Sequence, residues 1–495
     1  MALFVPFSSS RRKFCSPGPG SRSGVSILED LEVVVGVRGC RAIPGRRRPP
    51  APMVMREPKP AGFPGLGDVH VRGSVLHRSR ENGEIPRDAI ASAGGLRSVK
   101  IVHVTLRFDA PGGVETTVRE VTRRLKSQGV DVEVFASDLL DESGWVRGTE
   151  FRSEVDGVPV RRFPVLKRPF PRAEAPLAAG RSGAISLPLM VGLVDALRES
   201  GADVIHVHSH RYGHVLQAAA VSRRTGTPLV ASTHYHPADR RESAIKRGLL
   251  RCEDVAFGWT AYRIARALVA ESELEARLVR GFAPRDRIRV IPPGIDLDAW
   301  ANPATDRTDD LALPERYLVY AGRIASNKGL SVLLDALAHL PASERIPLVM
   351  MGPDWGERSA LEARARSLGI DRDVRWLGMV LDPAKYRGVI RHARALVLPS
   401  EWEAYGLVLL DALAAGTPVV ATAAGGIPEV IDQGRAGRLV PYGDPAALST
   451  ALRATWQDPE GTHALVRHGS DWVRAHDWSM TVRRHLELYR ELVAH

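Results

Sequence analysis

Residues 395–415 have the sequence ALVLPSEWEAYGLVLLDALAA, and the class of fold follows from this stretch. Its opening residues are all apolar, which is typical of a short buried strand that ends at Leu398. A polar loop follows, and Gly406 opens an apolar helical run that continues to about Ala415. A buried strand joined by a loop to a helix is the repeating unit of α/β folds with parallel strands, so we expect that class here.

The same unit recurs along most of the chain, in two groups. The first group of predicted strands spans 99–104, 132–135, 204–208, 228–232, 267–270 and 287–291. After a polar stretch at 304–310, the second group spans 317–320, 347–351, 374–377, 395–398 and 418–421. Helical patterns separate the strands, and this alternation requires crossovers between parallel strands. The sequence therefore predicts two doubly wound, Rossmann-like domains that face each other across a ligand-binding cleft.

The predicted boundaries divide the chain into four parts. A disordered basic leader spans 1–97, a first domain 98–303, a second domain 304–476 and a terminal amphipathic helix 477–495. The leader is rich in Pro, Gly, Ser and Arg, and it buries too little apolar surface to offset its chain entropy. A transit peptide and a true start at Met53 or Met55 are alternative explanations of this segment.

The formal net charge of +11 is concentrated in the leader. Residues 1–100 contain 17 Lys and Arg against 8 Asp and Glu, which leaves only +2 for the other 395 residues. A nearly neutral folded body argues against nucleic acid as a partner. Three cysteines without metal-ligand or disulfide spacing, and no apolar run long enough to span a bilayer, favour a cytoplasmic protein.

The loop before the helix at Gly406 is the first candidate site. Glu403 lies at the carboxyl end of the strand, and Asp411 lies on the helix, 8 positions further on. Free N–H groups at a helix N-terminus suit phosphate, and carboxylates nearby suit sugar and ribose hydroxyls. The alternative is that Glu403 only caps the helix.

A second candidate site follows the strand at 317–320. Residues 322–329 have the sequence GRIASNKG, which places Arg323 and Lys328 in one loop between a strand and a helix. Two cations at this position are suited to hold a diphosphate that gains negative charge as it leaves. The alternative is that both are solvated loop charges.

Histidines and glycines mark the carboxyl ends of strands in the first domain. His206 and His208 alternate on one strand, and His234 follows the next strand. Their spacing resembles metal ligands, but no Cys or carboxylate completes a zinc set, so we expect His206 in the core and the other two histidines facing the cleft. Gly112 and Gly113 follow the first strand without a dinucleotide fingerprint, which argues against a dehydrogenase.

Taken together, these motifs resemble the retaining family 4 glycosyltransferases of the GT-B fold, from about Val99 to the C-terminus. Glu403 matches the first position of the family's E-x7-E element, and Asp411 stands where the family usually has Glu. The loop at 322–329 matches the family's G-R-x4-K-G element. The stretches 290–296, 415–421 and 425–429 are also similar to the family and occur in its order.

The resemblance implies a role for each matching residue. Arg323 and Lys328 would hold the donor's diphosphate, Glu403 would bind hydroxyls of the transferred sugar, and His208 would lie near the anomeric centre. Asp411 would bind the ribose hydroxyls, with a shorter reach than Glu. The remaining donor-binding residues implied by the match are Gly113, His234, Gly322, Ala404, Tyr405, Gly406 and Leu407.

The resemblance also implies the reaction. A hexose-type sugar would pass from a nucleoside-diphosphate donor, UDP- or GDP-linked, to a glycan, a lipid carrier or a small molecule. The leaving diphosphate would accept the acceptor's proton on the departing face, so no second carboxylate is needed, in contrast to glycosidases. No cofactor and no metal are expected, since the nucleotide-sugar is a substrate and the loops contain no D-x-D element.

Other functions stay open. A sugar phosphorylase or a nucleotide-sugar epimerase with the same fold would use a similar site, and a non-catalytic scaffold would bind nucleotide-sugar without turnover. Basic and apolar residues at 161–172 suggest either an exposed loop or a patch for peripheral contact with the inner membrane face. The base, the sugar and the acceptor are not specified by these motifs.

Overall fold

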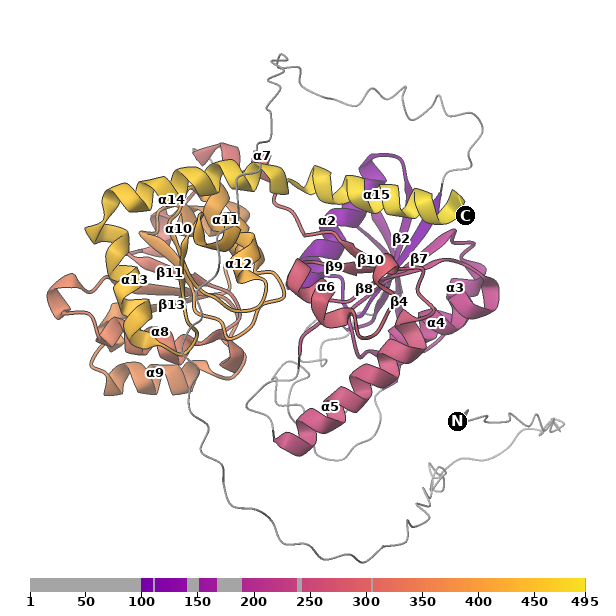
Figure 1. Cartoon of the computed structure of the whole chain (residues 1–495). Helices are drawn as coiled ribbons and strands as arrows, with labels where there is room; N and C mark the ends of the chain where they lie inside the picture. The colour runs from indigo at the N-terminus through magenta and orange to yellow at the C-terminus, as the bar shows by residue number, and fades with distance from the viewer. Residues whose placement is uncertain are drawn as a thin grey trace, which may run out of the picture. The chain divides into compact units, whose positions relative to one another are not determined.

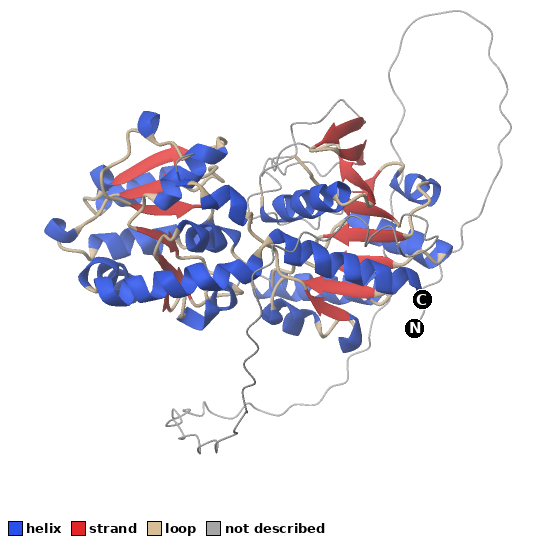
Figure 2. Cartoon of the chain, turned by 90° about the horizontal axis from the view of Figure 1, so that it is seen from above, coloured by secondary structure: helices blue, strands red, loops and turns tan. Residues whose placement is uncertain are grey.

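The structure, a computed structural model, describes residues 99–109, 112–139, 151–166, 189–237, 243–303 and 306–494. The predicted leader lies outside these residues. The described chain forms two α/β lobes, which we call the N-lobe and the C-lobe and which are coloured violet to red and orange to yellow in Figure 1. Each lobe contains one mostly parallel sheet with helices on both faces (Figure 2).

The N-lobe contains an eight-stranded sheet in the order β10-β9-β8-β7-β1-β2-β4-β3. Every neighbouring pair is parallel except β3 and β4. The strands are β1 (Lys100–Thr105), β2 (Asp131–Ser137), β3 (Arg152–Val155), β4 (Val158–Phe163), β7 (Val204–His208), β8 (Leu229–Ser232), β9 (Ala267–Ala270) and β10 (Ile288–Val290). A separate pair consists of β5 (Val165–Leu166) and β6 (Leu189–Met190). The helices are α2 (Gly113–Ser127), α3 (Leu193–Glu199), α4 (Gly213–Thr225), α5 (Ala244–Phe257) and α6 (Glu273–Val279).

The C-lobe contains a six-stranded, fully parallel sheet in the order β13-β12-β11-β14-β15-β16. Its strands are β11 (Leu318–Ala321), β12 (Leu348–Met351), β13 (Val374–Gly378), β14 (Ala395–Leu398), β15 (Val419–Thr422) and β16 (Arg438–Val440). Its helices are α8 (Leu330–Ala338), α9 (Arg358–Ser367), α10 (Pro383–Arg391), α11 (Leu407–Ala415), α12 (Ile427–Val430), α13 (Pro445–Gln457) and α14 (Pro459–Trp472).

Apolar strands explain why these sheets are covered on both faces. All residues of β11, β12, β14 and β15 are buried, and the helices supply leucines such as Leu333, Leu334 and Leu409 to the same core. A strand that is apolar on both faces has to be covered on both, and crossover helices provide the cover. Among the described residues, no helix is both long and apolar enough to cross a bilayer.

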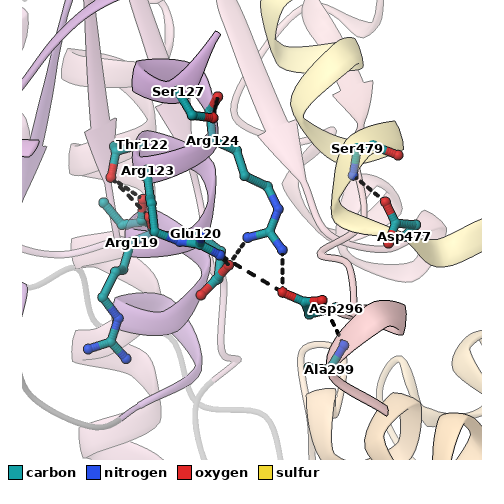
Figure 3. Close-up of polar contacts among 11 residues, drawn as sticks. Arg119, Glu120, Thr122, Arg123, Arg124, Ser127, Asp296, Ala299, Asp477 and Ser479 are labelled. Carbon is teal, nitrogen blue, oxygen red and sulfur yellow. Dashed lines mark hydrogen bonds and ion pairs between the residues drawn. The ribbon is translucent and has the colours of Figure 1, made fainter. Parts of the chain in front are cut away.

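The chain crosses between the lobes at two places. Asp296 precedes α7 (Leu297–Ala301), caps it by accepting a hydrogen bond from Ala299 N, and pairs with Arg124 of α2 at 2.8 Å (Figure 3). Ile295 bridges to Asp477, immediately before α15 (Trp478–Ala494). Helix α15 then packs against α2 and β7 of the N-lobe (Figure 1).

The predicted fold class is confirmed, and each of the eleven predicted strands overlaps an observed one. The strands β3, β4, β5, β6 and β16 were not predicted. The alternative of an exposed loop is wrong for Arg161 and Arg162, because both lie in β4. Arg162 is buried and pairs with Asp109 at 2.5 Å, while Arg161 lies over the ring of Phe163. Residues 167–172 of that patch lie outside the described residues.

Candidate active site

The order of strands marks one crevice in each lobe. In the C-lobe the chain passes from β11 to β12 and β13, and then returns to β14 on the other side of β11. In the N-lobe it leaves β1 for β2 and later returns to β7 on the other side of β1. The loops after two such strands diverge at their carboxyl ends and leave a crevice for a ligand. Arg323 and Glu403 follow β11 and β14, while His208 ends β7 and Gly113 begins α2, the helix that follows β1.

The C-lobe crevice brings Lys328 and Glu403 together. Lys328 Nζ lies 2.6 Å from Glu403 Oε1, and Ser400 Oγ donates to the same oxygen at 2.7 Å. Burial alone would raise the pKa of Glu403, but the Lys328 ammonium and the Ser400 hydroxyl hold it below its usual range. Burial lowers the pKa of Lys328, and Glu403 offsets part of that effect. Each partner therefore favours the charged form of the other.

Arg323 supplies a second cation at the same crevice. Its guanidinium lies over the ring of Trp355, 4.1 Å from the centroid. The loop itself is fixed by the Tyr320 hydroxyl, which donates to Arg323 O at 2.6 Å. Glu401 N donates to Asn327 O at 3.0 Å and joins this loop to the Glu403 loop. The two predicted sites are thus one site in the structure.

Two glycines allow the backbone to close around this pair. A Cβ on Gly329, where φ is +63°, would lie 2.0 Å from Pro399 O. A Cβ on Gly425, where φ is +59°, would lie 2.0 Å from Glu403 O. Both positions therefore require glycine for its conformation and for its lack of a side chain. The bond from Gly426 N to Glu403 O, at 2.9 Å, then fixes the Glu403 backbone.

Asp411 lies on α11 and is held by a residue that the sequence did not suggest. The Tyr386 hydroxyl of α10 donates to Asp411 Oδ2 at 2.7 Å. Burial raises the pKa of Asp411 to about 6, although the Tyr386 hydrogen bond acts in the opposite direction. At neutral pH the carboxylate is mostly ionised, with Oδ1 as its other acceptor atom.

The other predicted donor-binding residues lie around the start of α11. Gly406, with φ of +97°, precedes the helix, and no side chain of the described residues caps it. Tyr405 is buried, whereas Ala404 and Leu407 are partly exposed. A Cβ on Gly113 would lie 3.8 Å from Leu407 Cδ1, so the first turns of α2 and α11 are neighbours. Gly322 follows β11, beside the Tyr320 hydroxyl.

The predicted histidines form a buried row in the N-lobe. His208 is only 2% exposed, so the expectation that it faces an open cleft is wrong. Its Nε2 lies 3.0 Å from His103 Nδ1, and its Nδ1 lies 3.4 Å from His234 Nε2. His206 bonds the Tyr489 hydroxyl of α15 at 2.6 Å and Ser232 at 2.8 Å, as expected for a core histidine.

The pKa values of His208 and His234, two neighbours in this row, are shifted in opposite directions. Burial strongly lowers the pKa of His208, and neighbouring histidines lower it further, so its ring is neutral. Burial would also lower the pKa of His234, but the Glu271 carboxylate at 3.0 Å raises it above its usual value. His234 has a φ of +42°, and strain of this kind concentrates at functional sites.

His103, His206 and His208 each have one ring nitrogen that lies within 4.8 Å of the other two. These three nitrogens are close enough to hold a metal ion. These nitrogens already bond one another or Tyr489, Ser232 and His234. A metal would have to displace those bonds, which agrees poorly with a structural zinc site. The expectation that the protein uses no metal stays a prediction.

Sequence reasoning missed several residues of the site. Ser400 and Tyr386 orient the two acidic side chains, and Glu271 raises the pKa of His234. Glu429 of the C-lobe accepts hydrogen bonds from Glu273 N and Leu274 N at the start of α6, at 2.7 and 2.8 Å. Ser400 and Glu429 lie within sequence stretches that the motifs had already marked. Tyr386 and Glu271 lie outside every marked stretch, so no motif pointed to them.

Comparison with known proteins identifies the family. A family model for "Glycosyltransferase Family 4" matches residues 111–299, and one for "Glycosyl transferases group 1" matches residues 315–458. D-inositol 3-phosphate glycosyltransferase 1 from Catenulispora acidiphila is 32% identical over 410 residues, which cover 77% of this chain and 91% of the relative. D-inositol 3-phosphate glycosyltransferase from Acidothermus cellulolyticus is 31% identical, and the match covers 77% of this chain and 86% of that relative.

Solved structures give the same fold. Sucrose-phosphate synthase from Thermosynechococcus elongatus matches with a TM-score of 0.61 at 22% identity, covering 80% of this chain and 99% of that one. HepE from Anabaena, solved with UDP and glucose, matches with a TM-score of 0.60 at 18% identity. The match covers 79% of this chain and 100% of that one. The chain belongs to the family 4 glycosyltransferases and has the GT-B fold.

Proposed function

We propose that this glycosyltransferase transfers a hexose-type sugar from a UDP- or GDP-linked donor with retention of the anomeric configuration. The single observation that supports the proposal best is the contact between Lys328 and Glu403, 2.6 Å apart, with Arg323 in the same loop. Two cations and one oriented carboxylate at a strand switch point suit a ligand that combines pyrophosphate with a hydroxylated ring.

The cations act on the leaving group. When the bond between the anomeric carbon and the diphosphate oxygen breaks, the bonding electrons stay on that oxygen. Arg323 and Lys328 stabilise this charge more in the transition state than in the ground state, which is what accelerates the step. Free N–H groups at the start of α11 add partial positive charge at the same crevice.

Glu403 holds the sugar, and the acceptor attacks from the face that the diphosphate leaves. Glu403 Oε1 is already engaged by Lys328 and Ser400, which orient the carboxylate, and Oε2 is the atom available for a sugar hydroxyl. The acceptor oxygen forms the new bond to the anomeric carbon and passes its proton to the departing phosphate oxygen. The configuration is retained because both events occur on one face.

The N-lobe histidines complete the proposal. His208 is neutral, and a substrate that bonds it near the anomeric centre replaces one of its two ring contacts, to His103 or to His234. His234, whose pKa Glu271 raises against the effect of burial, contacts the His208 ring at 3.4 Å and orients it. Both residues lie at the carboxyl ends of neighbouring strands, the position at which doubly wound sheets bind ligands.

The acceptor that we propose is a small phosphorylated polyol. This part rests on the relatives alone, since proteins called D-inositol 3-phosphate glycosyltransferases are 31–32% identical to this chain over most of its length. The site of action that we propose is the cytoplasm, where nucleotide-sugars and phosphorylated polyols are free in solution.

A donor screen followed by a transfer assay tests the proposal. UDP-, GDP- and ADP-sugars are compared by thermal shift, because a bound ligand raises apparent stability by mass action. The stabilising donor is then incubated with inositol 3-phosphate, with free inositol and with no acceptor. We expect nucleoside diphosphate release that depends on the phosphorylated acceptor. Release of sugar 1-phosphate with inorganic phosphate as co-substrate would instead indicate a phosphorylase.

Variants of Glu403 separate a role in transfer from a role in folding. Glu403→Ala is expected to reduce transfer more than it reduces the affinity for free nucleoside diphosphate, which lacks the sugar. Ser400→Ala is the matched variant, because it removes one orienting bond and keeps the carboxylate. Equal losses of transfer and of nucleoside diphosphate affinity in Glu403→Ala would show that Glu403 only supports the loop.

A further inference from the structure

His236 lies in the loop that follows β8, and its side chain is exposed. In this it differs from His234, two positions earlier, and from His208 at the end of β7, which are both buried. Within the described part of the chain, no hydrogen bond engages the His236 ring. Ligands of doubly wound sheets bind at the carboxyl ends of the strands, where this loop begins. Both ring nitrogens of His236 are therefore available to a ligand at this edge of the N-lobe sheet.

The backbone that leads to His236 is fixed by two carboxylates at the start of α6. Tyr235 N donates to Glu275 Oε1 at 2.7 Å. Glu271 lies 3.0 Å from His234 Nδ1, and His234 has a φ of +42°. These buried contacts hold the turn in one conformation, so they also set the position from which the His236 side chain extends.

The start of α6 also contacts the C-lobe. Ser272, the N-cap of α6, donates through its hydroxyl to Ala404 O at 3.3 Å, and Ala404 directly follows Glu403. Glu429 of α12 accepts hydrogen bonds from the backbone of the first turn of α6, and Figure 1 shows the two helices as neighbours. The segment that positions His236 is therefore held beside the Glu403 loop.

Charged groups of the C-lobe act on the His236 ring. The pKa of His236 is lowered to about 4, first because protein atoms around the ring exclude bulk water, and second because of Arg323 and Lys328. Glu403 and Glu271 act in the opposite direction. Electrostatic effects between side chains extend over about 10 Å at 0.1 M salt, so the three C-lobe groups lie within that range of the ring. At neutral pH the ring is neutral, with one N–H donor and one acceptor nitrogen.

We propose that His236 is a donor-binding residue of the N-lobe, whose ring N–H donates a hydrogen bond to the diphosphate held by Arg323 and Lys328. This inference rests on the proposed function. Two cations attract the anion, and a neutral imidazole adds a directed donor without a third charge. An acceptor phosphate would offer the same chemistry, but the cations that act on this ring are those assigned to the donor. A diphosphate bound by all three residues links the two lobes.

Calorimetry with UDP and GDP on the full chain tests this contact. His236→Ala is expected to raise the Kd of the nucleoside diphosphate about tenfold or more, because a hydrogen bond to a charged group is lost. His236→Asn and His236→Gln keep an N–H donor at two side-chain lengths, and at least one is expected to recover most of the affinity. His463→Ala is the matched control, because His463 is also exposed but lies on α14, and it is expected to leave the Kd unchanged.

NMR of histidine ring nitrogens separates the donor from the acceptor. The ring signal that is missing in His236→Ala is expected to move when nucleoside diphosphate is added, and to stay in place with inositol 3-phosphate alone. A shift caused by inositol 3-phosphate alone would assign the ring to the acceptor and overturn the proposal. So would native affinity for nucleoside diphosphate in His236→Ala, or equal losses in all three His236 variants.

The proposed function and the role of His236 fail in different ways. A native protein that binds none of UDP, GDP and ADP would contradict the proposed function, and the assignment of His236 with it. A native protein that binds one of them, with an affinity that His236→Ala leaves unchanged, would overturn only the assignment of His236.

Discussion

At the scale of single residues, the two cations Arg323 and Lys328 define the proposed donor site. Arg323→Ala is expected to lose about 2–4 kcal/mol of transition-state stabilisation, by analogy with the loss of one donor to a developing oxyanion. The guanidinium stacks on Trp355 instead of supporting the fold through an ion pair with a described acid, so the variant should remain folded. Steady-state kinetics measures the loss as a decrease in kcat. Native turnover in Arg323→Ala would contradict its assignment to the diphosphate.

Lys328 needs a different substitution, because removing it leaves Glu403 without its partner. Lys328→Ala would combine lost catalysis with an unpaired carboxylate. The double variant Lys328→Met with Glu403→Gln keeps the volume and removes both charges. Its melting temperature separates the loss of activity from a loss of stability.

Asp411 gives the site a pH dependence. Its pKa is raised to about 6, so its carboxylate ionises as pH rises through that value and becomes an acceptor for ribose hydroxyls. Affinity for nucleoside diphosphate is therefore expected to rise between about pH 5 and pH 7. Asp411→Asn should remove this component and leave only the titration of the ligand. Stability has the opposite sign, because a raised carboxyl pKa means that stability is lost as pH rises from about 4 to about 6.

Tyr386→Phe is the matched variant for this prediction. The Tyr386 hydroxyl lowers the pKa of Asp411, so its removal is expected to move the midpoint of donor affinity to higher pH. Calorimetric titration at several pH values measures the midpoint. An unchanged or lower midpoint would show that Tyr386 does not control the ionisation of Asp411.

At the scale of elements, the close approach of Gly425 to the backbone of Glu403 fixes the Glu403 loop. Gly425→Ala is expected to cost about 1–2 kcal/mol for its left-handed backbone, and more for the contact of its Cβ with Glu403 O. Gly443→Ala is the control, because Gly443 shares the positive φ but has open space around it. Urea unfolding of both variants measures the difference. Equal losses would mean that the loop tolerates the methyl group.

The elements also show what sequence reasoning can and cannot reach. Strands such as β11 and β14 were predicted because every residue is apolar and a helix pattern follows. Strand β4 was missed because Pro159, Arg161 and Arg162 interrupt its apolar pattern, and only folding shows that Asp109 pairs with the buried Arg162. The role of Tyr386 could not be predicted for a similar reason. It contacts Asp411, which lies 25 positions further along the chain and on another helix.

At the scale of the whole molecule, Glu429 links the lobes. Its carboxylate caps α6 by accepting hydrogen bonds from Glu273 N and Leu274 N. Glu429→Ala leaves those N–H groups without this acceptor and is expected to lower kcat and raise KM together, if closure of the lobes assembles the proposed site. Glu429→Gln keeps one oxygen acceptor and should lie between native and Glu429→Ala. A change confined to melting temperature would make Glu429 a structural cap only.

The central claim is that sugar leaves a nucleoside diphosphate and reaches the acceptor with its configuration retained. Proton NMR of one reaction, with an α-linked nucleotide-sugar and the phosphorylated acceptor, tests this claim directly. The account predicts one equivalent of nucleoside diphosphate and a product whose anomeric coupling is that of an α-linkage, with both signals lost in Arg323→Ala. A β-linked product, or a product formed without release of nucleoside diphosphate, would contradict it.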